Sequence, residues 1–216
     1  MWVSPTRFEH PGKAGRYHHG DLRAALVDAA IDLIAERGLR RFSLAEASRR
    51  LGVSVAAPYR HFADRDALLA AVAVRALQVF AEMLVDEAGD AENIEQQLAA
   101  MARAYVRFAA EQRPLFETLY QSGIDKRRYP ELARAYEPID AFESLVAEVN
   151  VDDADALAGA LEAAAHGHAA LLVDGEYGEG EEAVRVAADR ASRATLALIA
   201  GYAALQRPRR RRRHGA

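Results

Sequence analysis

Apolar residues recur at three- and four-residue steps along nearly the whole chain, and this helical periodicity is the feature that most constrains the fold. Leu22, Leu26, Ala29 and Leu33 share one face of a first helix, which Asp21 can cap. The alternation of apolar and polar residues that is typical of strands is not found. The sequence therefore predicts an all-α protein.

Capping and helix-breaking residues divide this periodicity into successive helices. Ser43 and Glu46 form a capping box for a short helix that ends at Gly52. A third short helix is expected over 55–62, and a long fourth helix begins after Asp64. Further helices are expected over 93–111, 113–121, 130–149, 154–174 and 181–205.

The chain has 216 residues and no cysteine. Disulfides, thiolate zinc sites and cysteine nucleophiles are therefore excluded, and the composition fits a reducing cytoplasm. The first 20 residues are polar and interrupted by proline and glycine, which does not fit a secretory signal. No run of about 18 apolar residues is recognised, so we expect no membrane span. These features predict a cytoplasmic protein.

Charge is distributed unevenly, although the net charge is only −4. Residues 1–65 hold 11 Lys/Arg and 7 Asp/Glu, whereas residues 66–206 hold 11 and 25. The last ten residues add six arginines and no acid. A cationic N-terminal part on an acidic body indicates a polyanionic partner at that end, although such asymmetry also arises on solvated surfaces. The arginine-rich tail either strengthens nonspecific DNA binding or has no role.

The expected helices 43–51 and 55–62 are joined by Gly-Val-Ser, which is typical of a helix-turn-helix. Gly52 permits the sharp turn, and Ser48 is small enough to let the two helices cross closely. Pro58 falls at about the fourth helical position, where its missing N–H forfeits only an early hydrogen bond. One face of the second helix stays uncovered and fits a major groove. The side chains expected to face DNA are Ser54, Ala56, Tyr59, Arg60 and His61.

This region resembles the DNA-binding domain of TetR-family transcriptional regulators. The similarity covers about residues 18–75, in HHGDLRAALVDAAIDLIAERG and FSLAEASRRLGVSVAAPYRHFADRDALLAAV. It includes the Tyr-x-His-Phe end and a basic residue three positions beyond the Phe. The resemblance implies contacts with phosphates or the DNA backbone from Ser43, Tyr59, His61 and Arg65. It implies positions near bases for Ser54, Val55, Ala56 and Arg60.

The C-terminal part is similar to one subtype of the same family. FAAEQRPLFETLY and the later AHGHAALL match it, but Ala165 stands where the subtype usually has the Trp of Trp-His-Gly. The resemblance implies a body that dimerises and encloses a pocket for a small, largely apolar effector. The alternative is that the aromatic residues there are core. The candidate lining residues are Tyr105, Phe108, Phe116, Tyr120, Tyr136, Phe142 and His166.

Small and apolar residues mark the last two long helices, over about 154–174 and 181–205, as a candidate dimer interface. The earlier helix carries Leu157, Leu161, Ala164, His168 and Leu171 at helical steps. The later helix carries Val184, Ala187, Ala188, Ala191, Thr195, Leu198, Ile199 and Tyr202. Two such helices can form a four-helix interface with a second copy. The alternative is that both faces bury against the same chain.

The leading hypothesis is a ligand-responsive, sequence-specific DNA-binding transcriptional regulator, a repressor rather than an activator, acting as a homodimer on a palindromic operator. The expected parts are an arm over 1–17, a helix-turn-helix domain over 18–65, a ligand-binding and dimerisation domain over 66–205 and a tail over 206–216. No cofactor and no metal are expected, because His166 and His168 lie on different helix faces. The alternatives are a helical enzyme, for which no nucleophile–base pair is recognised, and a scaffold that binds a protein partner.

Overall fold

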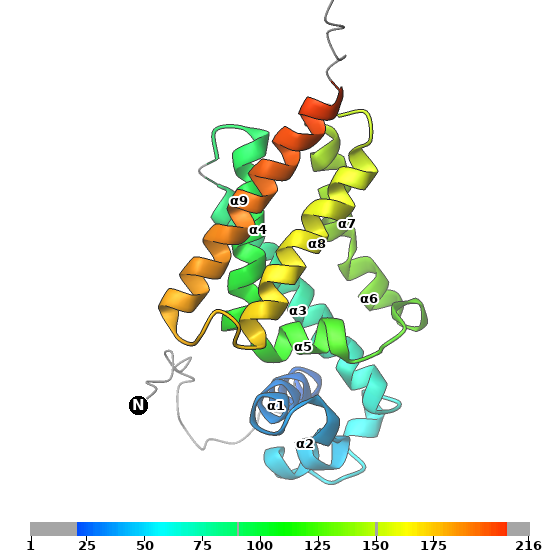
Figure 1. Ribbon diagram of the computed structural model, residues 1–216. Helices are drawn as coiled ribbons and strands as arrows, with labels where there is room; N and C mark the ends of the chain where they lie inside the picture. Colours follow the sequence, from blue (N-terminus) through cyan, green and yellow to red (C-terminus); the bar gives the residue numbers. More distant parts are fainter. Residues whose placement is uncertain (1–20, 90, 150, 207–216) are drawn as a thin grey trace, which may run out of the picture.

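The computed structural model describes residues 21–89, 91–149 and 151–206, and the regular elements within these ranges are all helices (Figure 1). The all-α prediction is confirmed for this part of the chain. The expected arm over 1–17 and tail residues 207–216 lie outside it. The α-helices are α1 (Leu22–Arg37), α2 (Leu44–Leu51), α3 (Arg65–Ala88), α4 (Ile94–Glu111), α5 (Arg113–Gln121), α6 (Pro130–Ala135), α7 (Glu137–Ala147), α8 (Ala154–Val173) and α9 (Glu181–Gln206). The 3₁₀-helices are η1 (Leu39–Arg41), η2 (Pro58–Arg60) and η3 (Lys126–Arg128).

The expected helix caps form in the N-terminal unit, which comprises α1, η1, α2 and η2 and ends where α3 begins. The Asp21 carboxylate accepts a hydrogen bond from the backbone N–H of Ala24 at 3.0 Å. The Ser43 hydroxyl accepts one from Glu46 N–H at 3.2 Å, which begins α2. Asp64 likewise begins α3. These local bonds satisfy N–H groups that the first turn of a helix leaves without partners.

The helix predicted over 55–62 is wrong as an α-helix. Residues 55–57 form turns, and only Pro58–Arg60 is regular, as the 3₁₀-helix η2. Pro58 has no N–H to donate to the Ser54 carbonyl, which instead accepts from Ala57 N–H at 3.0 Å. The chain still follows a helical path, because His61 N–H bonds to the Pro58 carbonyl at 2.9 Å.

The helix predicted over 130–149 is also divided, into α6 and α7, with the break at Tyr136. Pro138 follows the break, and a proline cannot donate a backbone hydrogen bond back to the preceding turn. Tyr136 N–H bonds instead to the Ala133 carbonyl at 3.2 Å. The chain therefore changes direction at the residue whose ring enters the internal cavity described below.

The long helix α3 joins the N-terminal unit to the C-terminal body (Figure 1). It contacts α1 at one end and α4, α5, α6 and α7 further along. One continuous apolar cluster runs from Leu26 and Phe62 through Leu69 to Phe108 and Ala187. The two parts of the protein therefore share a core rather than meeting through a flexible linker.

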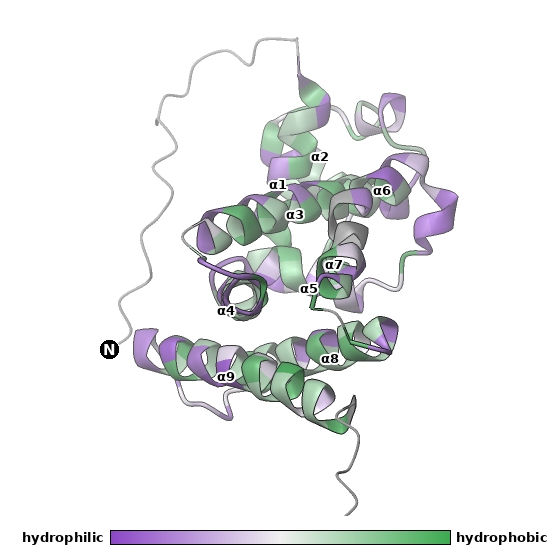
Figure 2. Cartoon of the chain, turned by 90° about the horizontal axis from the view of Figure 1, so that it is seen from above, coloured by the Kyte–Doolittle hydropathy of each residue, from purple (hydrophilic) through white to green (hydrophobic). Residues whose placement is uncertain are grey.

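Helices α8 and α9 lie side by side along one edge of the body, with α4 between them and α3 (Figure 2). The stripe predicted on α9 for a dimer faces inward: Ala187, Ala191, Thr195 and Ile199 are buried within the chain. The same is true of Leu157 on α8. Most residues of these two stripes are therefore buried against the same chain, which was the alternative interpretation. A second copy would have to bind the outward faces of α8 and α9.

By length and composition alone, α3 and α8 could each cross a bilayer, with mean hydropathies of 1.9 and 1.3 over 18 residues. The expectation of no membrane span rested on the lack of an unbroken apolar run, and Arg75 and Glu82 do interrupt α3. In α3, however, Leu68, Leu69 and Val72 are fully buried among other helices of the protein. The helices of a protein core are hydrophobic for that reason.

Two glycines have backbone angles that separate their roles. Gly38 ends α1 at φ 77° and ψ 159°, a region that essentially only glycine occupies, whereas Gly52 ends α2 in the left-handed region at φ 67° and ψ 24°. A Cβ at either position would meet no atom within 4 Å. Substitution there changes backbone strain alone.

We expect Gly38→Ala to lower the free energy of unfolding by about 2 kcal/mol and Gly52→Ala by about 1 kcal/mol, measured by urea denaturation. Asparagine tolerates the left-handed region, so Gly52→Asn should recover most of its loss, whereas Gly38→Asn should not. Equal losses for the two asparagine variants would contradict this assignment.

Candidate functional site

Six side chains on the segment after Gly52 are left to solvent. The exposed fractions of Val55 and Tyr59 are 57% and 61%. The segment is held by its other side: Pro58 is buried, Phe62 is 3% exposed, and the Arg23 guanidinium lies 5.3 Å from the Phe62 ring centroid. The exposed set is Ser54, Val55, Ala56, Tyr59, Arg60 and His61, all of which the sequence predicted to lie near DNA.

Ser43 lies at the N-terminus of α2, beside a network of charged side chains. Glu46 in the first turn of α2 binds Arg37 at 2.7 Å and also pairs with Arg49. The hydrogen bond from Arg49, with the charge of Arg37, holds the pKa of Glu46 below its usual value. Arg50 binds Glu36 across the α1–α2 contact at 2.6 Å. These arginines are therefore partly neutralised by the protein itself.

Sequence reasoning missed two cations next to Ser43. Arg40 and Arg41 lie on η1 and are exposed, and neither forms an ion pair with any residue in the described ranges. Together with Arg60 they offer positive charge that is not paired with any acid in the described ranges. A basic pair that ends two residues before a capping serine was the pattern that could have indicated them.

Arg65, which was predicted to contact a phosphate, is already bound to backbone carbonyls of the N-terminal unit. Its guanidinium donates to the Leu39 carbonyl at 2.7 Å and to the Phe42 carbonyl at 3.2 Å, and lies 5.7 Å from the Phe42 ring centroid. The side chain remains 38% exposed. Arg65 thus fixes η1 against the start of α3, while its contact with DNA stays a prediction.

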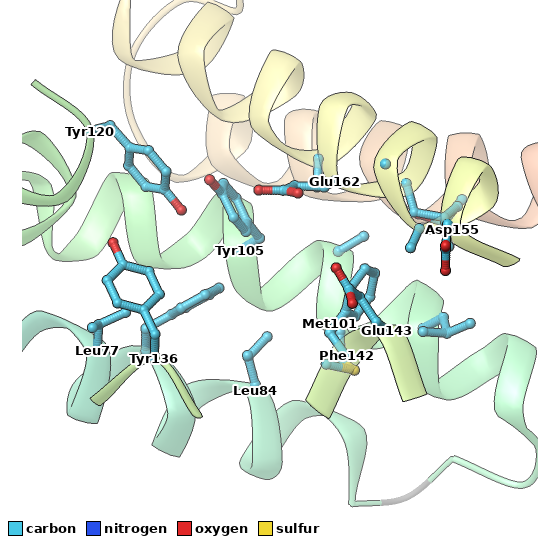
Figure 3. A pocket seen from close by; sticks show the side chains of 18 of the residues that line it. Leu77, Leu84, Met101, Tyr105, Tyr120, Tyr136, Phe142, Glu143, Asp155 and Glu162 are labelled. Atoms are coloured by element: carbon cyan, nitrogen blue, oxygen red, sulfur yellow. The ribbon is translucent and has the colours of Figure 1, made fainter. Parts of the chain in front are cut away.

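A cavity of about 480 Å³ lies in the body, between α3, α4 and α8, with walls from the other C-terminal helices (Figure 3). Its apolar lining includes Leu77, Phe80, Leu84, Leu98, Met101 and Leu161. Four of the seven predicted lining residues reach it: Tyr105, Tyr120, Tyr136 and Phe142. This volume is in the range of sites that hold drug-sized molecules.

The other three predicted residues stand behind the cavity wall. Phe108 and Phe116 are 1% and 3% exposed and pack as core. The His166 ring stacks on Phe116 with centroids 5.8 Å apart. Its Nδ1 lies 2.9 Å from the hydroxyl oxygen of Tyr105, so His166 positions a lining residue instead of lining the cavity. The Nδ1 atom of His168 lies 2.5 Å from the Tyr177 hydroxyl oxygen, so the two histidines have different partners.

Three tyrosine hydroxyls converge at one end of the cavity (Figure 3). Burial raises the pKa of Tyr105 far above its ordinary value, and Tyr120 and the Glu162 carboxylate add to this rise. Burial also raises the pKa of Tyr120, to about 12. Both phenols are therefore neutral at physiological pH and can donate hydrogen bonds.

Sequence reasoning, which considered aromatic residues, missed the charged part of the lining. Glu143, Asp155 and Glu162 lie around the cavity, and Lys126 is the cation among its lining residues. Asp155 and Glu162 are two turns apart on α8, with the lining residue Gly159 between them. This helical spacing, which continues to His166, could have indicated that they share a face.

Thr195 on α9 contributes a polar group that has no partner. Its side chain is 1% exposed and lines the cavity. Its hydroxyl oxygen is buried and forms no hydrogen bond. No other buried side-chain oxygen or nitrogen atom in the described ranges lacks one. An unpaired buried hydroxyl is unfavourable, so a polar group that reached Thr195 would be stabilised there.

Comparisons with known proteins agree with this architecture. Residues 26–72 match the family model for bacterial regulatory proteins of the TetR family, and residues 98–195 match the tetracyclin repressor-like C-terminal domain. An uncharacterized HTH-type transcriptional regulator of Bacillus subtilis (strain 168), YobS, is 29% identical over 102 residues, 47% of this chain. The match spans about half of that relative, 53% of its length.

Solved structures share the fold over most of the chain. A protein of unknown function from Rhodococcus sp. RHA1 is 30% identical, with a TM-score of 0.67 over 82% of this chain and 96% of that one. RolR, solved in complex with resorcinol, is 20% identical, with a TM-score of 0.56 over 86% of this chain and 93% of that one.

These findings define the class of protein: a helix-turn-helix transcription regulator that binds DNA and is not an enzyme. The chain belongs to the TetR family.

Arg65 and Tyr59 should respond differently to substitution. We expect Arg65→Ala to lower both DNA affinity and the free energy of unfolding, the latter by about 1–2 kcal/mol, because two backbone carbonyls lose a charged donor. Tyr59→Ala should weaken DNA binding without a change in stability, because its side chain is mostly exposed. Fluorescence anisotropy with duplex DNA and urea denaturation would measure the two effects. A stable Arg65→Ala variant would argue against the positioning role.

Proposed function

We propose that this protein is a ligand-responsive repressor that binds a palindromic operator as a homodimer. The observation that carries the proposal is the course of α3. This helix begins at Arg65, which fixes the N-terminal unit, and its middle supplies Leu77, Phe80 and Leu84 to the cavity wall. A ligand that fills the cavity therefore acts on the helix that sets the position of the DNA-binding segment.

Repression and release follow from two positions of α3. A dimer binds an operator well only when its two DNA-binding segments have the spacing of successive major grooves. A ligand that fits the cavity better when α3 is displaced would favour the wrong spacing and lower operator affinity. The RolR structure contains resorcinol, which shows that a related protein holds a small organic ligand.

The outward faces of α8 and α9 are the surface we propose for dimerisation. They carry small residues that let helix backbones approach closely, and a second copy of the chain fits them because a two-fold axis would pair each face with itself. The residues on α8 are Ala156, Ala160, Ala163, Gly167 and Ala170. Those on α9 are Ala197, Ala200, Gly201 and Ala204. Leu171 and Leu196, 45% and 41% exposed, add larger apolar side chains.

The DNA contacts we propose are those of the exposed segment after Gly52. Tyr59, His61 and Ser43 would contact phosphates, and Arg40 and Arg41 would add charge beside Ser43. Ser54, Val55, Ala56 and Arg60 would lie at base edges, where a guanidinium and a methyl group can distinguish base pairs. Because the protein acts on chromosomal DNA, we place it in the cytoplasm.

The operator is testable without knowledge of the regulated gene. Selection from random duplexes at low salt should enrich an inverted repeat, and the observed binding constant should fall steeply as salt rises. Substituting Arg60 should change the enriched sequence, whereas Tyr59→Phe should change affinity with the sequence unaltered. Selection that enriches no sequence would favour the scaffold alternative.

The dimer surface has its own test, with a matched pair of alanine-to-arginine variants. We expect Ala197→Arg, on the outward face of α9, to give monomers in light scattering and to lower operator affinity about 100-fold, because the two half-sites are no longer bound together. Ala133→Arg places the same side chain at an exposed alanine of α6 and should leave both properties unchanged. A dimeric Ala197→Arg variant with intact DNA binding would refute this interface.

A further inference from the structure

We infer that the ligand of the cavity is an organic cation with an apolar body, held with its charge between Glu162 and the three tyrosines. The inference concerns the chemistry of the ligand. It rests on the proposed function only where that ligand is called the effector.

Formal charge around the cavity favours a cation. The lining holds three carboxylates, Glu143, Asp155 and Glu162, against one ammonium, Lys126. A bound anion would lie among like charges that no arginine of the lining offsets. A bound cation would lose little on leaving water, because the carboxylates replace part of its hydration.

Glu162 has a specific place in this arrangement. Figure 3 shows its carboxylate directed toward Tyr105, across the cavity from Tyr136. After the larger effect of burial, its charge also helps to raise the pKa of both Tyr105 and Tyr120. Aromatic faces next to a carboxylate are the surroundings in which proteins bind ammonium groups.

Lys126 marks where a cation can be accepted. Its ammonium nitrogen lies 4.2 Å from the centroid of the Tyr136 ring, within the range of a cation–π contact. Because the lysine is exposed at the edge of the cavity, it can withdraw when another cation occupies the same ring. Lys126 is then a competitor of the ligand.

Thr195 and the apolar walls of the cavity indicate the chemistry of the rest of the ligand. The Thr195 hydroxyl has no hydrogen bond to a protein group in the described ranges, so this wall tolerates a polar atom of the ligand without requiring one. Leu84, Leu98 and Met101 form walls that favour an apolar body. The walls therefore favour an organic cation with an apolar body.

Three probes of equal chain length test the charge preference by calorimetry: octyltrimethylammonium, 1-octanol and octanoate. We expect the cation to bind at least about tenfold more tightly than octanol, and octanoate to bind most weakly. Octanoate binding as tightly as the cation would overturn the inference, as would failure of all three probes to bind.

Variants of single lining residues sharpen the test. Glu162→Gln keeps the shape of the side chain and should lower affinity for octyltrimethylammonium about tenfold, with octanol affinity changed less than about twofold. Lys126→Met removes the competing ammonium and should raise affinity for the cation. Glu148→Gln, an exposed acid on the C-terminal side of α7 and outside the lining, is the matched control and should change neither. An unchanged affinity in a folded Glu162→Gln variant would overturn the inference.

DNA binding measured with the same probes separates this inference from the proposed function. Tight binding of the cation without loss of DNA affinity would support the ligand class and contradict ligand-responsive repression. Release of DNA by octanol or octanoate, but not by the cation, would support repression and contradict the ligand class.

Discussion

The packing of α3 against the rest of the chain is the interaction on which the whole structure depends. Six of its nine buried residues belong to the same apolar cluster as buried residues of α1, α4, α5, α8 and α9. Close-packed protein interiors transmit a displacement of one element to its neighbours instead of absorbing it. The N-terminal unit therefore cannot turn relative to the body without rearranging the core near Phe80, which lines the cavity.

Local interactions were predictable from the sequence, and those set by tertiary contact were less so. The caps at Asp21, Ser43 and Asp64 use side chains and N–H groups three residues apart, so spacing was enough. The segment 55–62 differed because Pro58 leaves the Ser54 carbonyl free for a tighter turn. The apolar stripe of α9 was assigned to a dimer interface but is buried within the chain. Helical spacing identifies such a stripe but not the element that covers it.

The candidate cavity shows the same division. Spacing placed aromatic residues on the inner faces of helices, but depth decided which of them reach the cavity: Phe108 and Phe116 fill the layer behind Tyr105. The acidic lining joins Glu143 of α7 to Glu162 of α8. Only the folded arrangement brings these helices together, so no reading of one segment could assemble the set.

The exposed segment after Gly52 carries a consequence for how such a protein diversifies. Pro58 and Phe62 anchor it from within, while the outward side chains add nothing to the core. Substitutions on that outer side are therefore nearly free of folding penalty. Under the proposed function, operator preference can drift between descendants of one ancestor while stability and the cavity are inherited intact.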